Sequence, residues 1–114
     1  MAQFDIHENN GANREAIPYV VVVQSALYDD FRRRVVVPMV RKSAVGTVDR
    51  KRFNPAFRIK GVTVILHPLE ISSVPVDRLG KIVGSLAGDG PRIIDALDEL
   101  LTRSWGWQAS RSGA

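Results

Sequence analysis

Two runs of β-branched residues constrain the fold of this chain most. Residues 17–25 read IPYVVVVQS, and residues 32–40 read RRRVVVPMV. Consecutive valines disfavour a helix and suit the pleated surface of a sheet. The first run is expected to form a central strand that is buried on both faces. The second is expected to end, bulge or border the sheet at Pro38, because proline cannot donate a hydrogen bond to a strand ladder.

Shorter runs predict further strands. Residues 3–7 (QFDIH) alternate apolar and polar side chains, and residues 69–76 (LEISSVPV) alternate again as a plausible last strand. Residues 57–59 and 62–66 flank Lys60-Gly61. A glycine in the second position of a two-residue loop suits a turn with positive φ, so this segment predicts a hairpin.

The segments between these runs are predicted to be connections. Residues 8–15 are polar and rich in Gly and Asn, and residues 41–52 are basic and poorly periodic, which indicates surface loops. Residues 77–88 contain three glycines and are expected to form at most a short helical turn.

One stretch, residues 89–107, predicts a full helix. Its apolar residues, spaced by three and four, are Ile93, Ile94, Leu97, Leu100, Leu101 and Trp105. Pro91 suits the first turn, and either Asp89 or Gly90 before it is expected to be the cap. Gly106 is expected to stop the helix after Trp105.

The expected fold class is mainly β with a C-terminal α-helix. Five to seven short antiparallel strands in 114 residues favour a small barrel or half-barrel over a sandwich. We expect one domain over residues 1–107. Residues 108–114 (QASRSGA) are small and polar, which predicts a flexible tail.

Composition excludes several classes of protein. The sequence has no cysteine, so it has no disulfide framework, thiolate nucleophile or cysteine-based zinc site. No apolar run approaches the roughly 20 residues of a membrane span, and the polar start lacks the apolar core of a signal peptide. We therefore expect a cytoplasmic protein without a membrane partner.

The residues that could carry chemistry form no recognisable catalytic or metal motif. His7 and His67 are isolated, so neither a metal site nor a cofactor is expected. Ser72 and Ser73 lie near His67, but no nucleophile elbow surrounds them. The sequence therefore predicts a protein that is not an enzyme.

Two basic clusters leave nucleic-acid contact open. They are residues 32–34 and 50–52, and they are interpreted either as solvated strand ends or as phosphate contacts. The flanking Phe31 and Phe53 are good core candidates rather than base-stacking platforms. We expect no direct sequence-specific binding to nucleic acid.

Five short motifs occur along almost the whole chain. They are Gln3-Phe4, Val23-Gln24-Ser25, Arg33-Arg34 followed by Val35-Val36-Val37-Pro38, Ser73-Val74-Pro75-Val76 with Leu79-Gly80, and the helix ending in Trp105-Gly106. In this order and at these separations the chain resembles the CcdB toxins, the toxin half of the ccd type II toxin–antitoxin modules. The resemblance covers residues 3–107. Its most specific part is the combination of SVPV with a terminal Trp-Gly.

The resemblance implies a small SH3-like β-barrel with an added small sheet and a C-terminal helix, assembled as a homodimer. It also implies a function connected with plasmid maintenance. Such toxins bind the A subunit of DNA gyrase and trap the cleaved-DNA complex, without catalysis of their own. A CcdA-like antitoxin neutralises the toxin through a disordered segment that folds on binding.

The gyrase-binding residues that the resemblance implies are Trp105, Gly106 and Trp107. A tryptophan can stack its apolar face on a guanidinium of the partner, and Gly106 would let the backbone approach closely. The family ends with an aliphatic residue where this chain has Trp107 followed by residues 108–114. The helix is also expected to be longer than in the family.

Two alternatives accompany this prediction. The first is an endoribonuclease toxin, because the related MazF/Kid toxins use the same superfold; the arginine clusters and His67 support it, but an acid–base pair is lacking. The second is a CcdB-like interaction module without toxicity, which the departures at the C-terminal end motivate.

Overall fold

The computed structural model describes residues 2–46 and 50–102. Its strands are β1 (Asp5–Glu8), β2 (Tyr19–Val22), β3 (Arg33–Arg41), β4 (Ala56–Ile59), β5 (Val62–Leu66), β6 (Ser72–Pro75) and β7 (Ile82–Ser85). Its helices are α1 (Lys42–Val45) and α2 (Gly90–Leu101), with 3-10 turns η1 (Ala26–Tyr28), η2 (Pro68–Glu70), η3 (Val76–Arg78) and η4 (Ala87–Asp89). None of these helices is long and apolar enough to cross a membrane.

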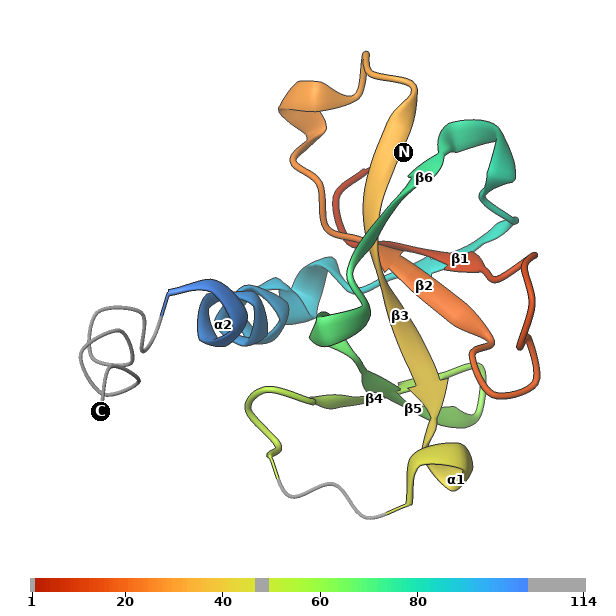
Figure 1. Cartoon of the computed structure of the whole chain (residues 1–114), viewed down its shortest axis with the longest axis vertical. Coiled ribbons are helices and arrows are strands. Elements are labelled where there is room, and N and C mark those ends of the chain that lie inside the picture. The colour runs from red at the N-terminus through yellow and green to blue at the C-terminus, as the bar shows by residue number, and fades with distance from the viewer. Residues whose placement is uncertain (1, 47–49, 103–114) are drawn as a thin grey trace, which may run out of the picture.

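All strand pairs are antiparallel. The order across the sheet is β4-β5-β3-β2-β1-β7, and β6 joins the sheet on β3. The sheet curls into a half-barrel, and α2 lies against it (Figure 1). The expected fold class, mainly antiparallel β with a C-terminal helix, is confirmed.

β3 organises the sheet and continues through Pro38. On one edge, residues 36–39 pair with β2; on the other, β6 pairs with residues 33–36 and β5 with residues 39–41. Pro38 lies on this second edge between the residues that pair with β6 and those that pair with β5. Its carbonyl accepts the N–H of His67 at 3.0 Å. The prediction that the strand ends, bulges or borders the sheet at Pro38 is therefore wrong, although the missing N–H does fall at the border between two partner strands.

The predictions of a central strand within residues 17–25 and of a hairpin around Lys60-Gly61 are confirmed. β2 is central, with Val21 and Val22 fully buried between β1 and β3. In the hairpin of β4 and β5, Lys60 has φ 50° and Gly61 has φ 80°. Two consecutive positive φ angles are typical of a type I′ turn.

The prediction for residues 69–88 needs a correction. β6 is not the last strand, because residues 82–85 form β7, and the helical turn expected in residues 77–88 is limited to the 3-10 turns η3 and η4 at the two ends of that range. β7 pairs with β1, and the Glu8 N–H donates to the Lys81 carbonyl at 2.9 Å just before it. The pairing supplies the hydrogen bonds that a glycine-rich segment could not gain as a helix.

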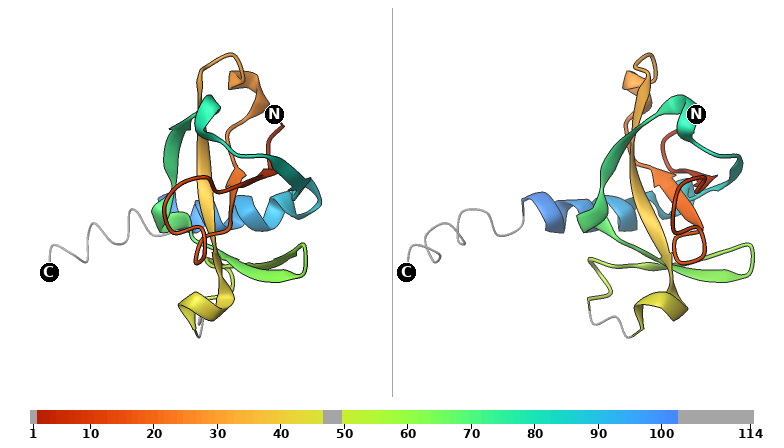
Figure 2. Two further views of the ribbon diagram at one scale, coloured as in Figure 1. Left: turned by 90° about the vertical axis from the view of Figure 1, so that its right-hand side faces the viewer. Right: turned by 45° about the vertical axis from the view of Figure 1, so that its right-hand side comes forward.

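α2 places Ile93 and Ala96 in the core at 0% exposure, and Leu97 packs against the same cluster. Two other residues of the predicted apolar stripe are not covered, since Ile94 is 42% and Leu101 69% exposed, while Leu100 is half-buried. α2 ends at Leu101, and the remainder of the predicted helix, from residue 103 to Trp105, lies outside the described residues. Figure 2 shows the last turn of α2 reaching beyond the strands.

Candidate functional site

Among the described residues, no hydrogen bond or ion pair joins the residues considered for catalysis to one another. His7 lies on β1, and His67 lies between β5 and η2, where its Nδ1 is buried without a hydrogen-bond partner among the described residues. Ser73 lies on β6, where its hydroxyl oxygen accepts the Nε–H of Arg33 at 2.8 Å. Within residues 2–46 and 50–102, no group of three or more His, Asp or Glu could hold a metal ion.

The predicted gyrase-binding residues, Trp105, Gly106 and Trp107, lie outside the described residues, as do residues 108–114. Their role stays a prediction. The other motifs of the sequence all lie inside the described part. Their contacts show what they do for the fold.

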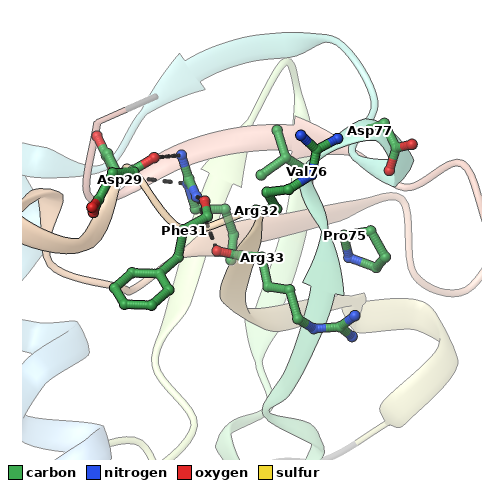
Figure 3. A pocket seen from close by; sticks show the side chains of 9 residues that line it. Asp29, Phe31, Arg32, Arg33, Pro75, Val76 and Asp77 are labelled. Carbon is green, nitrogen blue, oxygen red and sulfur yellow. Dashed lines mark hydrogen bonds and ion pairs between the residues drawn. The ribbon is translucent and has the colours of Figure 1, made fainter.

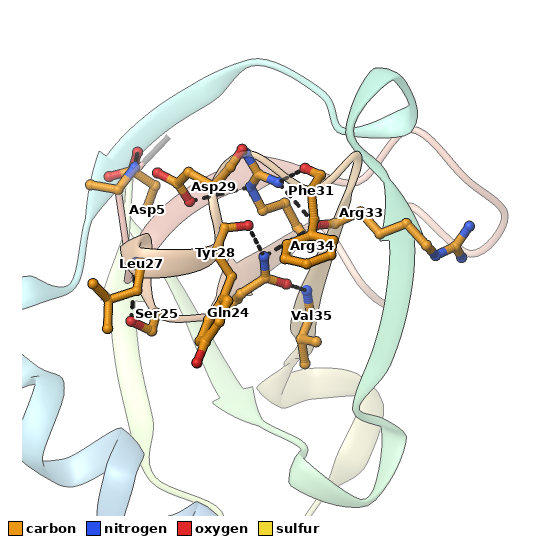
Figure 4. A network of polar contacts seen from close by, with 11 residues as sticks. Asp5, Gln24, Ser25, Leu27, Tyr28, Asp29, Phe31, Arg33, Arg34 and Val35 are labelled. Atoms are coloured by element: carbon orange, nitrogen blue, oxygen red, sulfur yellow. Dashed lines mark hydrogen bonds and ion pairs between the residues drawn. The ribbon is translucent and has the colours of Figure 1, made fainter.

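Gln24 links the end of β2 to the start of β3. Its amide donates to the carbonyls of Tyr28 at 3.0 Å and Arg33 at 3.2 Å, and its side-chain oxygen accepts the N–H of Val35 at 3.0 Å. Ser25 caps η1 by accepting the N–H of Leu27. Figure 4 shows this network. Together these contacts fix residues 25–34, called the η1 loop below.

Arg34 is the internal support of the η1 loop. Its guanidinium donates to three backbone carbonyls, those of Phe31 at 2.6 Å, Asp29 at 2.8 Å and Arg33 at 2.9 Å, and it lies 3.6 Å from the Asp29 carboxylate (Figure 4). The residue is only 5% exposed. The interpretation of residues 32–34 as solvated strand ends is therefore wrong for Arg34, whose guanidinium is buried and bound by carbonyls of the loop.

The η1 loop displays apolar side chains on its outer surface. Leu27 is 83%, Tyr28 54% and Phe31 62% exposed, and the two aromatic rings lie 6.2 Å apart. The expectation that Phe31 belongs to the core is wrong. Exposed aromatic groups on a rigid loop are typical of protein-binding surfaces. The sequence signal for this surface is an apolar triplet inside a segment that also carries Asp29 and Asp30.

A pocket of about 600 Å³ lies beside this apolar surface. It is lined by residues of the η1 loop and of the β6–η3 segment: Asp29, Asp30, Phe31, Arg32, Arg33, Arg34, Pro75, Val76 and Asp77. Figure 3 shows the side chains of the two segments around the pocket. Arg33 joins the segments, because its guanidinium also donates to the Ser73 carbonyl at 2.8 Å. The arrangement suits contact with a protein partner.

The Gln3-Phe4 motif ties the start of the chain to β2 and to α2. The Gln3 amide donates to the Val23 carbonyl at 3.0 Å, and the Phe4 N–H donates to the Val22 carbonyl at 2.6 Å. The Phe4 ring packs so closely on Gly90 that an added Cβ there would lie 2.8 Å from a ring carbon. Glycine at the start of α2 is thus required by packing.

The Leu79-Gly80 motif lies just before β7 and contacts β1. His7 is 1% exposed, and its Nδ1–H donates to the Gly80 carbonyl at 2.8 Å, because a carbonyl oxygen only accepts. His7 is therefore a buried residue of β1 whose side chain holds the segment just before β7. A Cβ on Gly80 would collide with the Glu8 carbonyl and lie 2.9 Å from the side-chain oxygen of Asn10.

Four of the five sequence motifs thus have a defined place in one fold. A family model described as CcdB protein matches residues 3–103. The chain belongs to the CcdB family. A search of curated proteins found no match. The CcdB family comprises toxins of toxin–antitoxin systems, and the motifs that this chain shares with it hold the η1 loop, β6 and the start of α2 in place.

The CcdB motif at Gly80 permits a stability test. Gly80→Ala is expected to lower the free energy of unfolding by about 1–3 kcal/mol, because the methyl group meets backbone and side-chain atoms that cannot both move away. Urea unfolding followed by circular dichroism measures the change. Gly88→Ala is the matched control, since no atom lies within 4 Å of a Cβ there, and its effect should stay within about 1 kcal/mol. Equal effects of the two changes would contradict the packing argument.

Proposed function

We propose that this CcdB family protein binds the A subunit of DNA gyrase and traps the cleaved-DNA complex, with no catalysis of its own. The observation that carries the proposal is the family match, which extends over residues 3–103 and stops just before Trp105-Gly106. We assign the contact with gyrase to Trp105, Gly106 and Trp107. Tryptophan is enriched among binding hot spots, and a glycine lets the backbone approach a partner closely.

Trapping of this kind needs only differential binding. A protein that binds the cleaved-DNA state of an enzyme more tightly than its other states raises the population of that state. No general acid, base or nucleophile is required. The η1 loop supports the proposal as a second apolar contact surface, because hydrogen bonds from Gln24 and Arg34 hold the backbone carbonyls of Tyr28 and Phe31, whose side chains are exposed.

The proposal includes two further partners. We expect the chain to form a homodimer and to be neutralised by a CcdA-like antitoxin in the cytoplasm, where gyrase is found. An antitoxin segment that folds on binding would gain contact area from the exposed Leu27, Tyr28 and Phe31. The endoribonuclease alternative gains no support from His67, since its Nδ1 is buried and has no hydrogen-bond partner among the described residues.

Expression in two bacterial hosts tests the proposed function. One host carries a susceptible gyrase A subunit, and the other carries a poison-resistant A subunit. We expect growth to stop in the susceptible host alone, with viability falling by orders of magnitude. Equal growth of both hosts would contradict the proposal and favour a module without toxicity. Death of both hosts with equal loss of messenger RNA would instead favour the endoribonuclease.

A further inference from the structure

The positive charge of this chain is concentrated in one segment. Residues 41–60 contain seven of the 16 Lys and Arg residues and one of the 12 Asp and Glu residues. The segment therefore carries a formal charge of +6, while the rest of the chain carries −2, although the whole chain carries only +4. Such an asymmetry points to a polyanionic partner at one place on the surface.

The fold brings the described part of this segment to one end of the molecule, called the basic end below. Its basic residues are Arg41, Lys42, Arg50, Lys51, Arg52, Arg58 and Lys60. They lie on the end of β3, on α1, on the turn before β4 and on the β4–β5 hairpin. Figures 1 and 2 show these elements together, at the end opposite the η1 loop. All seven are exposed except Arg41, which is half-buried.

Most of this charge is not neutralised within the described residues. Arg52 lies 3.5 Å from Asp95, and both side chains are about half exposed. Arg41 donates to the Glu15 carbonyl and Arg58 to the Thr63 hydroxyl, which leaves both charges in place. In residues 2–46 and 50–102, Lys42, Lys51 and Lys60 have no side-chain hydrogen bond or ion pair. These lysines are available to an external anion.

The chemistry of the basic end favours phosphates over a protein or a single strand. Val45, at 37% exposure, is its one exposed large apolar side chain within the described residues. A protein interface would need aromatic or aliphatic anchors, and single-strand binding would need exposed rings for base stacking. Phe57 is unsuitable for stacking, since it is buried with the Arg92 guanidinium 4.5 Å above its ring.

We propose that the basic end binds the phosphate backbone of double-stranded DNA without sequence preference. Lysines and arginines that neutralise phosphates release counterions, and this supplies the binding free energy. The inference stands on the charge distribution and does not require gyrase binding. If gyrase is the partner, the basic end can face the DNA that gyrase holds, because it lies away from the η1 loop.

Fluorescence anisotropy with two unrelated fluorescein-labelled duplexes of about 20 base pairs tests the proposal. We expect equal affinities for both duplexes, with dissociation constants on the order of 10⁻⁵ M near physiological salt and a steep fall in affinity as salt rises. In the triple variant Lys42→Gln, Lys51→Gln, Lys60→Gln, affinity near 0.1 M salt should fall between about 10-fold and about 500-fold. The slope of log affinity against log salt should become shallower by up to about 2.7, at about 0.9 for each lost phosphate contact.

The matched control removes the same charge elsewhere. Arg32, Arg78 and Lys81 are exposed and lie outside the basic end, so the triple variant Arg32→Gln, Arg78→Gln, Lys81→Gln should keep affinity within about 3-fold. Equal losses in the two triple variants would overturn the proposal, because net charge alone would then explain binding. A preference for one duplex would overturn it as well. Equally tight binding to poly-glutamate would assign the surface to acidic proteins instead.

Discussion

Replacing Arg34 by methionine is expected to lower the free energy of unfolding by about 3–5 kcal/mol. Arg34 is 5% exposed, and its guanidinium donates to three backbone carbonyls of the η1 loop, at 2.6, 2.8 and 2.9 Å. Methionine fills a similar volume but donates nothing, so the three carbonyls lose their charged partner. Asp29 also loses the cation that lies 3.6 Å from its carboxylate. Urea unfolding followed by circular dichroism measures the loss.

The neighbouring arginine supplies the control for this change. Arg33 is exposed and makes its two hydrogen bonds to Ser73 at the surface. Arg33→Met should therefore lower the free energy of unfolding by less than about 1.5 kcal/mol. If the two variants unfold at the same urea concentration, the internal role assigned to Arg34 is wrong. A small domain with a total stability of about 5–15 kcal/mol would show the expected difference clearly.

Truncation after Ser104 is expected to abolish trapping of the cleaved-DNA complex of gyrase. The deletion removes Trp105, Gly106 and Trp107 together. Loss of a tryptophan hot spot weakens binding by about 2–4 kcal/mol, which corresponds to roughly 30-fold to 1,000-fold. The amount of linear plasmid DNA that accumulates with purified gyrase measures trapping. Truncation after Trp107 is the control, and it should leave trapping intact if residues 108–114 take no part.

The local signals in the sequence were sufficient for much of the fold. Consecutive valines predicted β2, and the pair Lys60-Gly61 predicted the hairpin of β4 and β5. The spacing of Ile93 and Leu97 predicted the buried face of α2. Each of these signals acts between residues that are close in the chain. β7 was missed because its hydrogen bonds come from β1, more than seventy residues earlier.

The candidate site was less predictable for the same physical reason. Nothing near Arg34 in the sequence indicates that its charge is satisfied by carbonyls inside a loop. Phe31 has a large apolar side chain of the kind that usually lies in a core. Only the conformation of the η1 loop turns it outward, to 62% exposure. The residues assigned to gyrase, Trp105 to Trp107, come from family resemblance and remain a prediction.

The most direct test of the central claim is the linear-DNA assay with the full-length protein. Supercoiled plasmid, ATP and purified gyrase are incubated with the protein, and the mixture is then treated with denaturant and protease. We predict that linear plasmid accumulates in proportion to the added protein, and that a poison-resistant gyrase A subunit prevents it. Plasmid that stays free of double-strand breaks at protein concentrations well above that of gyrase would contradict the proposed function.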